Sequence, residues 1–240
     1  MKILFGIIAL CVITLLSNVA FSDEPIKVTI SHTFNDVIFD GEWSFRQEWK
    51  ASSLDEFRFD NDDLILRTAH QDNYMYIMIN VLGDVRDDHM ADRAIVCFDG
   101  NETSKMADES DWCYVATRGS KNGHTLNGGS PIYQTSHFNI QKNHPDFIAI
   151  GGTSGPNDRY IQTPHAVYEF KIPIEQIGFE NEYGFFMQVF DGNTVMTYPT
   201  EHSGQYPQKI PSPQQWGLMI SPDHSITSEH FNQNLRGMNY

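Results

Sequence analysis

Basic residues, cysteines and long apolar segments are all scarce in this chain of 240 residues. It has 16 Lys and Arg residues against 31 Asp and Glu residues, which gives a formal net charge of −15 at pH 7. Such a surface repels nucleic acid and anionic membranes, because contacts to phosphate require Lys and Arg. The composition therefore argues against nucleic acid as a partner. It suits cations, neutral ligands such as glycans, or solubility alone.

The long apolar run of the sequence lies at the N-terminus, where Lys2 precedes residues 3–16. This run is shorter than the roughly 20 apolar residues of a membrane-spanning helix. Small side chains occupy the −3 and −1 positions before Asp23, as at a signal-peptidase site. We predict a signal peptide over residues 1–22 and a protein that is secreted or associated with the cell surface, with no membrane insertion after cleavage. Residues 23–240 are then one domain, long enough to bury its own core.

Only three cysteines occur, and Cys11 lies within the predicted signal peptide. Cys97 and Cys113 lie in two apolar runs that flank a turn-forming sequence at residues 99–101. If these runs pair as a hairpin, the two thiols come within disulfide distance across adjacent strands. Because exported proteins meet an oxidising compartment, we predict a Cys97–Cys113 disulfide; two buried free thiols are the alternative.

Helical periodicity is nearly absent, and one helical turn at residues 174–178 is expected. Elsewhere apolar residues alternate with polar ones, as on strands with one face in a core. The predicted strands are 27–31, 63–70, 74–81, 94–98, 112–117, 146–151, 165–172, 184–190 and 216–220. Short strands separated by Gly, Pro, Asn and Asp clusters predict an all-β antiparallel sandwich of jelly-roll type with long loops. Residues 121–145, rich in Gly, Asn and Ser, are predicted to be one such loop, either a binding lid or an excursion.

Several motifs occur in an order that is similar to a known family. They are Phe39-Asp40-Gly41, Glu48-Trp49-Lys50, residues 72–81 followed by Asp84, residues 92–100, residues 168–174, and Pro213 with Trp216-Gly217-Leu218. Together they resemble the carbohydrate-binding module family 9-like group, which shares a broader fold with DOMON domains and the haem-binding gamma subunit of ethylbenzene dehydrogenase. The resemblance covers most of residues 23–240. It implies a β-sandwich that binds a ligand without catalysis, with Trp49 and Trp216 as structural residues.

Sugar binding requires exposed aromatic faces with hydrogen-bonding side chains beside them. Trp112 is our candidate for a platform that stacks on a sugar ring, and Tyr198 and Tyr206, in predicted loops, border the same site. The loop at residues 84–90 contains no aromatic residue, which departs from the two-tryptophan sandwich of the family's sugar-binding members. We expect a secreted, non-catalytic protein that binds a glycan or polysaccharide.

The same loop is rich in carboxylates, with Asp84, Asp87, Asp88 and Asp92 close together in the sequence. Residues 60–63 form a further acidic cluster. Calcium takes six to eight oxygen ligands, commonly from carboxylates and loop carbonyls, and calcium-bearing loops occur in the resembled family. We predict the four aspartates as ligands of a structural calcium ion; simple solvated acids are the alternative.

Haem b is the alternative ligand that the resemblance implies, because relatives hold haem with Met plus His or Lys. The candidates in this chain are Met75, Met78, Met90, Met187 and Met196 with His70, His89 and His165. A structural protein of the cell envelope with no small-molecule ligand is the second alternative.

Catalytic motifs are missing from the sequence. It has no Gly-x-Ser-x-Gly elbow, no His-Glu-x-x-His and no phosphate-binding glycine loop. The ten histidines are scattered and show no paired metal-ligand spacing. We therefore predict that the protein is not an enzyme. Neither a particular sugar nor an oligomeric state is predicted.

Overall fold

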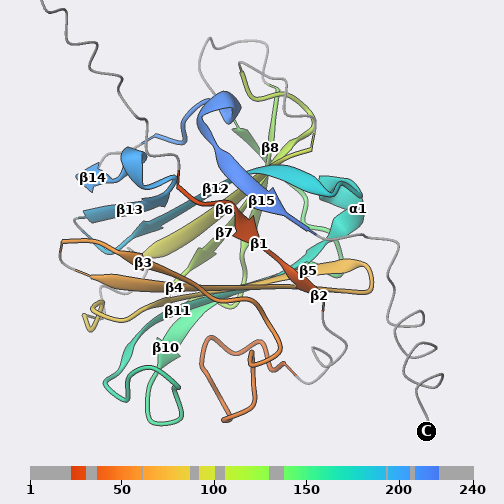
Figure 1. The fold of residues 1–240 in the computed structure, drawn as a ribbon. Helices are drawn as coiled ribbons and strands as arrows, with labels where there is room; N and C mark the ends of the chain where they lie inside the picture. Colours follow the sequence, from red (N-terminus) through yellow and green to blue (C-terminus); the bar gives the residue numbers. More distant parts are fainter. Residues whose placement is uncertain are drawn as a thin grey trace, which may run out of the picture.

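The computed structural model describes residues 23–30, 37–60, 62–86, 92–100, 106–129, 138–192, 194–205 and 209–221. Within these ranges two β-sheets stack as the two layers of a sandwich (Figure 1). This confirms the predicted all-β sandwich. No helix in the described ranges is long and apolar enough to cross a membrane. The predicted signal peptide lies outside the described residues.

The first sheet has nine strands. Its main path is β1 (Ile26–Lys27), β15 (Gly217–Ile220), β12 (Glu182–Phe190), β6 (Arg93–Asp99), β7 (Asp111–Thr117), β8 (His124–Gly128) and β9 (Phe138–Gln141). The end of β12 also pairs with β13 (Thr194–Tyr198), which pairs in turn with β14 (Gly204–Gln205). These two short strands extend one end of the sandwich, at the left of Figure 1.

The second sheet has six strands. Its path is β10 (Ile148–Ser154), β11 (His165–Pro173), β5 (Tyr74–Val81), β4 (Asp63–Gln71) and β2 (Thr29–Ile30), and β3 (Asp55–Arg58) pairs with β4. The N-terminal segment pairs with both sheets, because β1 joins β15 and β2 joins β4, each in parallel. The other strand pairs are antiparallel. The helical turn α1 (Ile174–Ile177) follows β11, where the sequence predicts it; short 3-10 turns lie at Thr200–His202 and Pro213–Gln215.

Alternation along each strand explains the core between the sheets. Met75, Ile77, Ile79 and Val81 on β5 are fully buried in the main apolar cluster, as predicted. The opposite face of β5 is also covered, since Tyr76 and Met78 belong to a second buried cluster. Because both faces are buried, β5 is apolar along most of its length.

The prediction of a single loop over residues 121–145 is wrong. β8 pairs with β7, and β9 pairs with β8, so the segment adds two strands to the edge of the nine-stranded sheet. The alternation is weak there because β8 is only partly buried and β9, at the sheet edge, is mostly exposed. The side chain of Ile140 on β9, for example, is 77% exposed.

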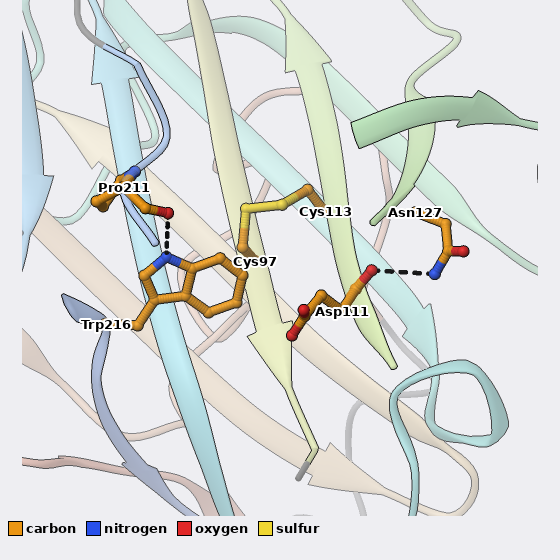
Figure 2. The surroundings of a disulfide bond; sticks show 6 residues. All are labelled: Cys97, Asp111, Cys113, Asn127, Pro211 and Trp216. Atoms are coloured by element: carbon orange, nitrogen blue, oxygen red, sulfur yellow. Dashed lines mark hydrogen bonds between the residues drawn. A yellow bond between two sulfur atoms is a disulfide. The ribbon is translucent and has the colours of Figure 1, made fainter. Parts of the chain in front are cut away.

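The predicted disulfide is confirmed. Cys97 and Cys113 are directly opposite on β6 and β7 and are bonded on the outer face of the nine-stranded sheet. Figure 2 shows Trp216 beside this bond, with its Nε1–H donating to the carbonyl of Pro211 at 3.1 Å. The indole is stacked on Phe186, with ring centroids 6.3 Å apart. Trp216 is therefore structural, as predicted.

Replacing both cysteines with alanine should lower the free energy of unfolding by about 3 kcal/mol. The bond closes a loop of sequence separation 16, and opening it gives the unfolded chain more conformational freedom. Urea denaturation of the variant and of the wild type at the same pH measures the difference. Equal unfolding free energies would show that the surrounding apolar cluster holds these strands without help from the bond.

Candidate functional site

A structural layer covers the outer face of the six-stranded sheet. It contains two of the motifs that carry the sequence resemblance, Phe39-Asp40-Gly41 and Glu48-Trp49-Lys50. Trp43 and Trp49 are each only 1% exposed. The carboxylate of Glu169, on β11, accepts hydrogen bonds from the backbone N–H of Asp40 (3.1 Å) and Gly41 (2.8 Å) and from the indole N–H of Trp49 (3.0 Å). One buried side chain thus fixes both motifs to the sheet. These tryptophans are structural rather than ligand-binding.

The charged groups in this layer are used internally. Burial raises the pKa of Glu169 to about 8, although its N–H donors act in the opposite direction. Arg67 donates to the carbonyl of Trp49 (3.2 Å) and to the hydroxyl of Tyr160 (2.6 Å), and its guanidinium lies 5.5 Å from the centre of the Trp43 ring. Glu169 and Arg67 are both buried, and each is bonded within this layer.

A buried Ser–Asp–His trio also proves structural. Ser154 donates to Asp158 (2.8 Å), and the Nε2 atom of His165 lies 3.5 Å from the same carboxylate. Asn80 donates to Asp158 as well (2.9 Å), while the Ser154 hydroxyl accepts the backbone N–H of Trp43. In a hydrolytic triad the histidine bonds to the serine; here serine and histidine both bind the aspartate. This trio fastens the outer layer.

Carboxylates from four separate turns meet at one end of the sandwich. Asp62 lies in the β3–β4 turn, Asp84 follows β5, Asp92 precedes β6 and Asp191 follows β12. The N–H of Gly83 donates to Asp62 at 2.5 Å, which joins two of these turns. Burial raises the pKa of Asp84 to about 7, and the negative charges of Asp92, Asp191 and Asp62 act in the same direction. The acidic clusters at residues 60–63 and 84–92 are therefore neighbours in space.

Two of the predicted calcium ligands have a protein counterion. The guanidinium of Arg118 lies 3.2 Å from Asp84 and 3.5 Å from Asp92, and all three side chains are almost fully buried. Asp87 and Asp88 lie outside the described residues. Among the residues that are described, no group of three or more His, Cys, Asp or Glu side chains is arranged to hold a metal ion. Calcium binding stays a prediction, and the pairing with Arg118 is a feature that the sequence pattern did not indicate.

A pocket of about 320 Å³ opens beside Asp62 and Asp191, between the β3–β4 turn and the β13–β14 pair. Its lining combines apolar, acidic and hydroxyl groups, among them Phe59, Met196, Asp60, Asp62, Asp191 and Ser203. Sequence reasoning noted the cluster at residues 60–63 but missed the pocket, because β13 and β14 were not predicted.

Backbone hydrogen bonds hold the acidic groups of the pocket in place. Phe59 and Asp62 exchange two backbone hydrogen bonds (2.9 and 3.3 Å) and close the β3–β4 turn. Asp191 accepts the N–H of Thr194 at 2.8 Å and so fixes the turn between β12 and β13. Burial raises the pKa of Asp62, and the charge of Asp191 contributes in the same direction. The site is a preformed pocket with apolar and acidic walls and a crowded negative charge.

The prediction that Tyr198 borders a sugar site is wrong. Its ring lies in the main core, 1% exposed, and its hydroxyl donates to the carbonyl of Leu218 at 3.0 Å. The neighbouring Pro199 suggested a loop, but Tyr198 is the last residue of β13 and pairs with Met187 on β12. Tyr206, its predicted companion, lies outside the described residues.

Trp112 is placed away from the pocket. It lies on β7 opposite Phe98, is partly buried and packs against the main core. The pocket lies near the other end of β6, where Arg93 pairs with Phe190. Phe98 and Arg93 are five residue steps apart along β6, which is roughly 17 Å at about 3.4 Å per residue. The structure does not bring Trp112 and the aspartates together, and the role of Trp112 in sugar binding stays a prediction.

The residues considered for haem have other roles in the described part of the chain. Met75 and Met187 lie in the closed core. His70 and His165 each contact a backbone carbonyl, those of Asp72 and Thr163, at 2.6 Å. His70 and Met75 are opposite each other on adjacent strands of one sheet, so they cannot hold a haem from its two faces. His89 and Met90 lie outside the described residues. These contacts do not form a haem site from His70, His165, Met75 and Met187, and haem binding stays a prediction.

The structure is a β-sandwich with an acidic pocket at one end. Comparison of the sequence with protein-family models and with curated proteins gives no match.

Two solved structures are similar to the chain, both of a carbohydrate-binding module family 9 protein from Caldicellulosiruptor kristjanssonii. The complex with glucose is 13% identical, with 84% of this chain and 97% of that chain covered and a TM-score of 0.47. The complex with cellotriose is 12% identical, with coverages of 85% and 98% and a TM-score of 0.46. The family of these structures is the one that the sequence motifs resemble.

Proposed function

We propose that the chain is an exported, non-catalytic protein that binds a carbohydrate in the acidic end pocket. The observation that carries this proposal is the composition of the pocket. Its carboxylates accept hydrogen bonds from sugar hydroxyls, and these charge-assisted bonds are stronger than neutral ones. Ser203 adds a hydroxyl, and Phe59 offers an apolar surface to the C–H groups of a sugar ring.

The size of the pocket also supports a small polar ligand. Its volume of about 320 Å³ is at the lower end of the range for small-molecule sites, roughly 300–1,000 Å³. That space suits one or two sugar units of a longer chain. Since the pocket lies at the end of the sandwich, the rest of a polysaccharide extends away from the protein.

Replacing Asp62 or Asp191 with asparagine should weaken carbohydrate binding about tenfold. Each substitution removes one charge-assisted hydrogen bond, and such bonds contribute about 1.5–3 kcal/mol. Isothermal titration calorimetry against soluble oligosaccharides of several compositions gives the affinities. Glu182→Gln is the matched control, because Glu182 is exposed at the opposite end of β12. It should bind like the wild type.

Trp112→Ala distinguishes the two sites in the same experiment. We expect it to retain wild-type affinity, since Trp112 lies at the other end of the sandwich. Loss of binding in Trp112→Ala together with normal binding in both aspartate variants would move the site to Trp112. Failure of the wild type to bind any oligosaccharide would favour a structural role in the cell envelope.

A further inference from the structure

The outer edge of β9 is an unprotected sheet edge. An edge strand presents main-chain N–H and C=O groups that can pair with another chain, and proteins commonly protect such strands with charged side chains or cover them. Among the described residues β9 pairs only with β8, and three of its four residues are exposed. Its sequence, Phe138-Asn139-Ile140-Gln141, contains no charge. The edge is therefore able to accept another strand.

The edge strands β3 and β10 are protected in these two ways. On β3, three of the four side chains are charged. The edge of β10 is covered by the chain that follows β7. There the carbonyl of Gly151 accepts the N–H of Gly119 at 2.8 Å, and the N–H of Gly151 donates to the carbonyl of Ser120 at 3.2 Å. β9 has neither kind of protection in the described part of the chain.

The charge around β9 differs from that of the rest of the chain. Residues 112–145 contain no Asp or Glu, although the chain has 31 of them. His124, which begins β8, and Lys142, which follows β9, are exposed at one end of this strand pair. Glu109 is exposed at the other end, where its carbonyl accepts the side-chain N–H of Asn127 at 2.9 Å. Two copies of such an acidic protein repel each other over most of their surface, so the acid-free edge is where they can approach most closely.

Antiparallel pairing of two β9 strands matches both the charges and the apolar contacts. A two-fold axis places the basic end of each strand pair beside the acidic end of the other copy. Ile140 is 77% exposed and continues an outer-face row that runs from Cys113 through Leu126. Pairing about Asn139 puts Ile140 of each copy opposite Phe138 of the other. Aromatic and β-branched residues stabilise such cross-strand pairs.

We propose that the β9 edge is a dimer interface of this protein. A second copy adds its own β9 in antiparallel orientation, and the two nine-stranded sheets join into one continuous sheet. This inference is independent of the ligand that the end pocket binds. An interface built on one short strand is small, so the dimer is in reversible equilibrium with the monomer.

Analytical ultracentrifugation of the whole protein tests the proposal. Because small interfaces are weak, we expect mainly monomer at about 2 µM and mainly dimer at about 200 µM. Ile140→Lys places a charge at the centre of the interface and should weaken dimerisation by about tenfold or more. Leu54→Lys is the matched control, since Leu54 is 46% exposed and lies beside β3 on the other sheet. It should dimerise like the wild type.

The charged end of the interface has its own pair of variants. Lys142→Glu should weaken dimerisation about fivefold, because it brings like charges together across the axis. Lys50→Glu changes the net charge equally at an exposed position of the outer layer and should have little effect. Circular dichroism checks that each variant is folded, as expected for substitutions at exposed positions.

The orientation of the strands is tested with Asn139→Cys. Pairing about this residue places the two new thiols directly opposite each other, and mild oxidation should link the two chains. A protein that stays monomeric up to about 200 µM, in the range where weak interfaces form, would overturn the proposal. A dimer that Ile140→Lys leaves unchanged would overturn it as well, because another surface would then hold the copies together. A dimer that Asn139→Cys does not cross-link would reject the antiparallel pairing.

Discussion

Replacing Glu169 with alanine is expected to lower the free energy of unfolding by at least about 4 kcal/mol. The substitution leaves the backbone N–H groups of Asp40 and Gly41 and the indole N–H of Trp49 without their acceptor. Each buried donor left unsatisfied costs about 1–3 kcal/mol. This is a large share of the 5–15 kcal/mol that stabilises a typical domain. Urea denaturation at pH 6 measures the loss.

Glu169→Gln provides a graded variant in case the alanine variant does not fold. The amide keeps one acceptor oxygen but points an NH₂ group at one set of donors, so a loss of about 2–3 kcal/mol is expected. Glu42→Gln is the control, because Glu42 is exposed in the same segment. A loss below about 1 kcal/mol in both Glu169 variants would show that the tryptophans hold the outer layer without this carboxylate.

The second large effect is a fall in stability as the pH rises. Burial raises the pKa of Glu169 to about 8 and of Asp84 and Asp111 to about 7, against ordinary values of 4.5 and 3.8. The folded protein therefore holds protons that the unfolded chain releases. Stability from these groups is complete below about pH 4 and is lost as the pH rises towards 8. Since one pKa unit corresponds to about 1.4 kcal/mol, the unfolding free energy should fall by at least about 3 kcal/mol between pH 5 and pH 8.5.

Urea denaturation at several pH values from 5 to 8.5 measures this slope. Glu169→Gln should show a shallower slope than the wild type, because its amide does not titrate, and Glu182→Gln should keep the wild-type slope. The pKa of Asp158 does not disturb this range. Burial would raise it, but hydrogen bonds from His165, Tyr160 and Ser154 lower it overall. Stability that increases steadily up to pH 8.5 would contradict the expectation.

Much of the fold could be predicted because alternation is strong wherever a strand has a core face. Strands β5, β11 and β12 bury whole rows of apolar side chains. The alternation of these side chains in the sequence predicts the sandwich. β8 is only partly buried, β9 at the sheet edge is mostly exposed, and β13 and β14 are short. Their assignment depends on pairing with β7 and β12, which local sequence does not contain.

The site residues were harder to predict, because residue type alone does not give orientation. Trp43, Trp49 and Trp216 are buried aromatic residues, and Tyr198, predicted as a ligand contact, is one as well. The segment that contains Asp84 and Asp92 has the composition of a metal-binding loop. Their counterion is Arg118, which directly follows β7, the second strand of the β6–β7 hairpin. Such a partner is visible only when the strands are paired.

The sequence by itself determined the sandwich class, the Cys97–Cys113 disulfide and the acidity of the loops. These are local properties: alternation, two cysteines flanking a turn, and the content of charged residues. Only the tertiary structure decided that Asp60, Asp62 and Asp191 share one pocket, and that Glu169 joins two motifs far from it in the sequence. The physical reason is that strand pairing in the two sheets brings distant turns to the same end, and no short segment specifies that pairing.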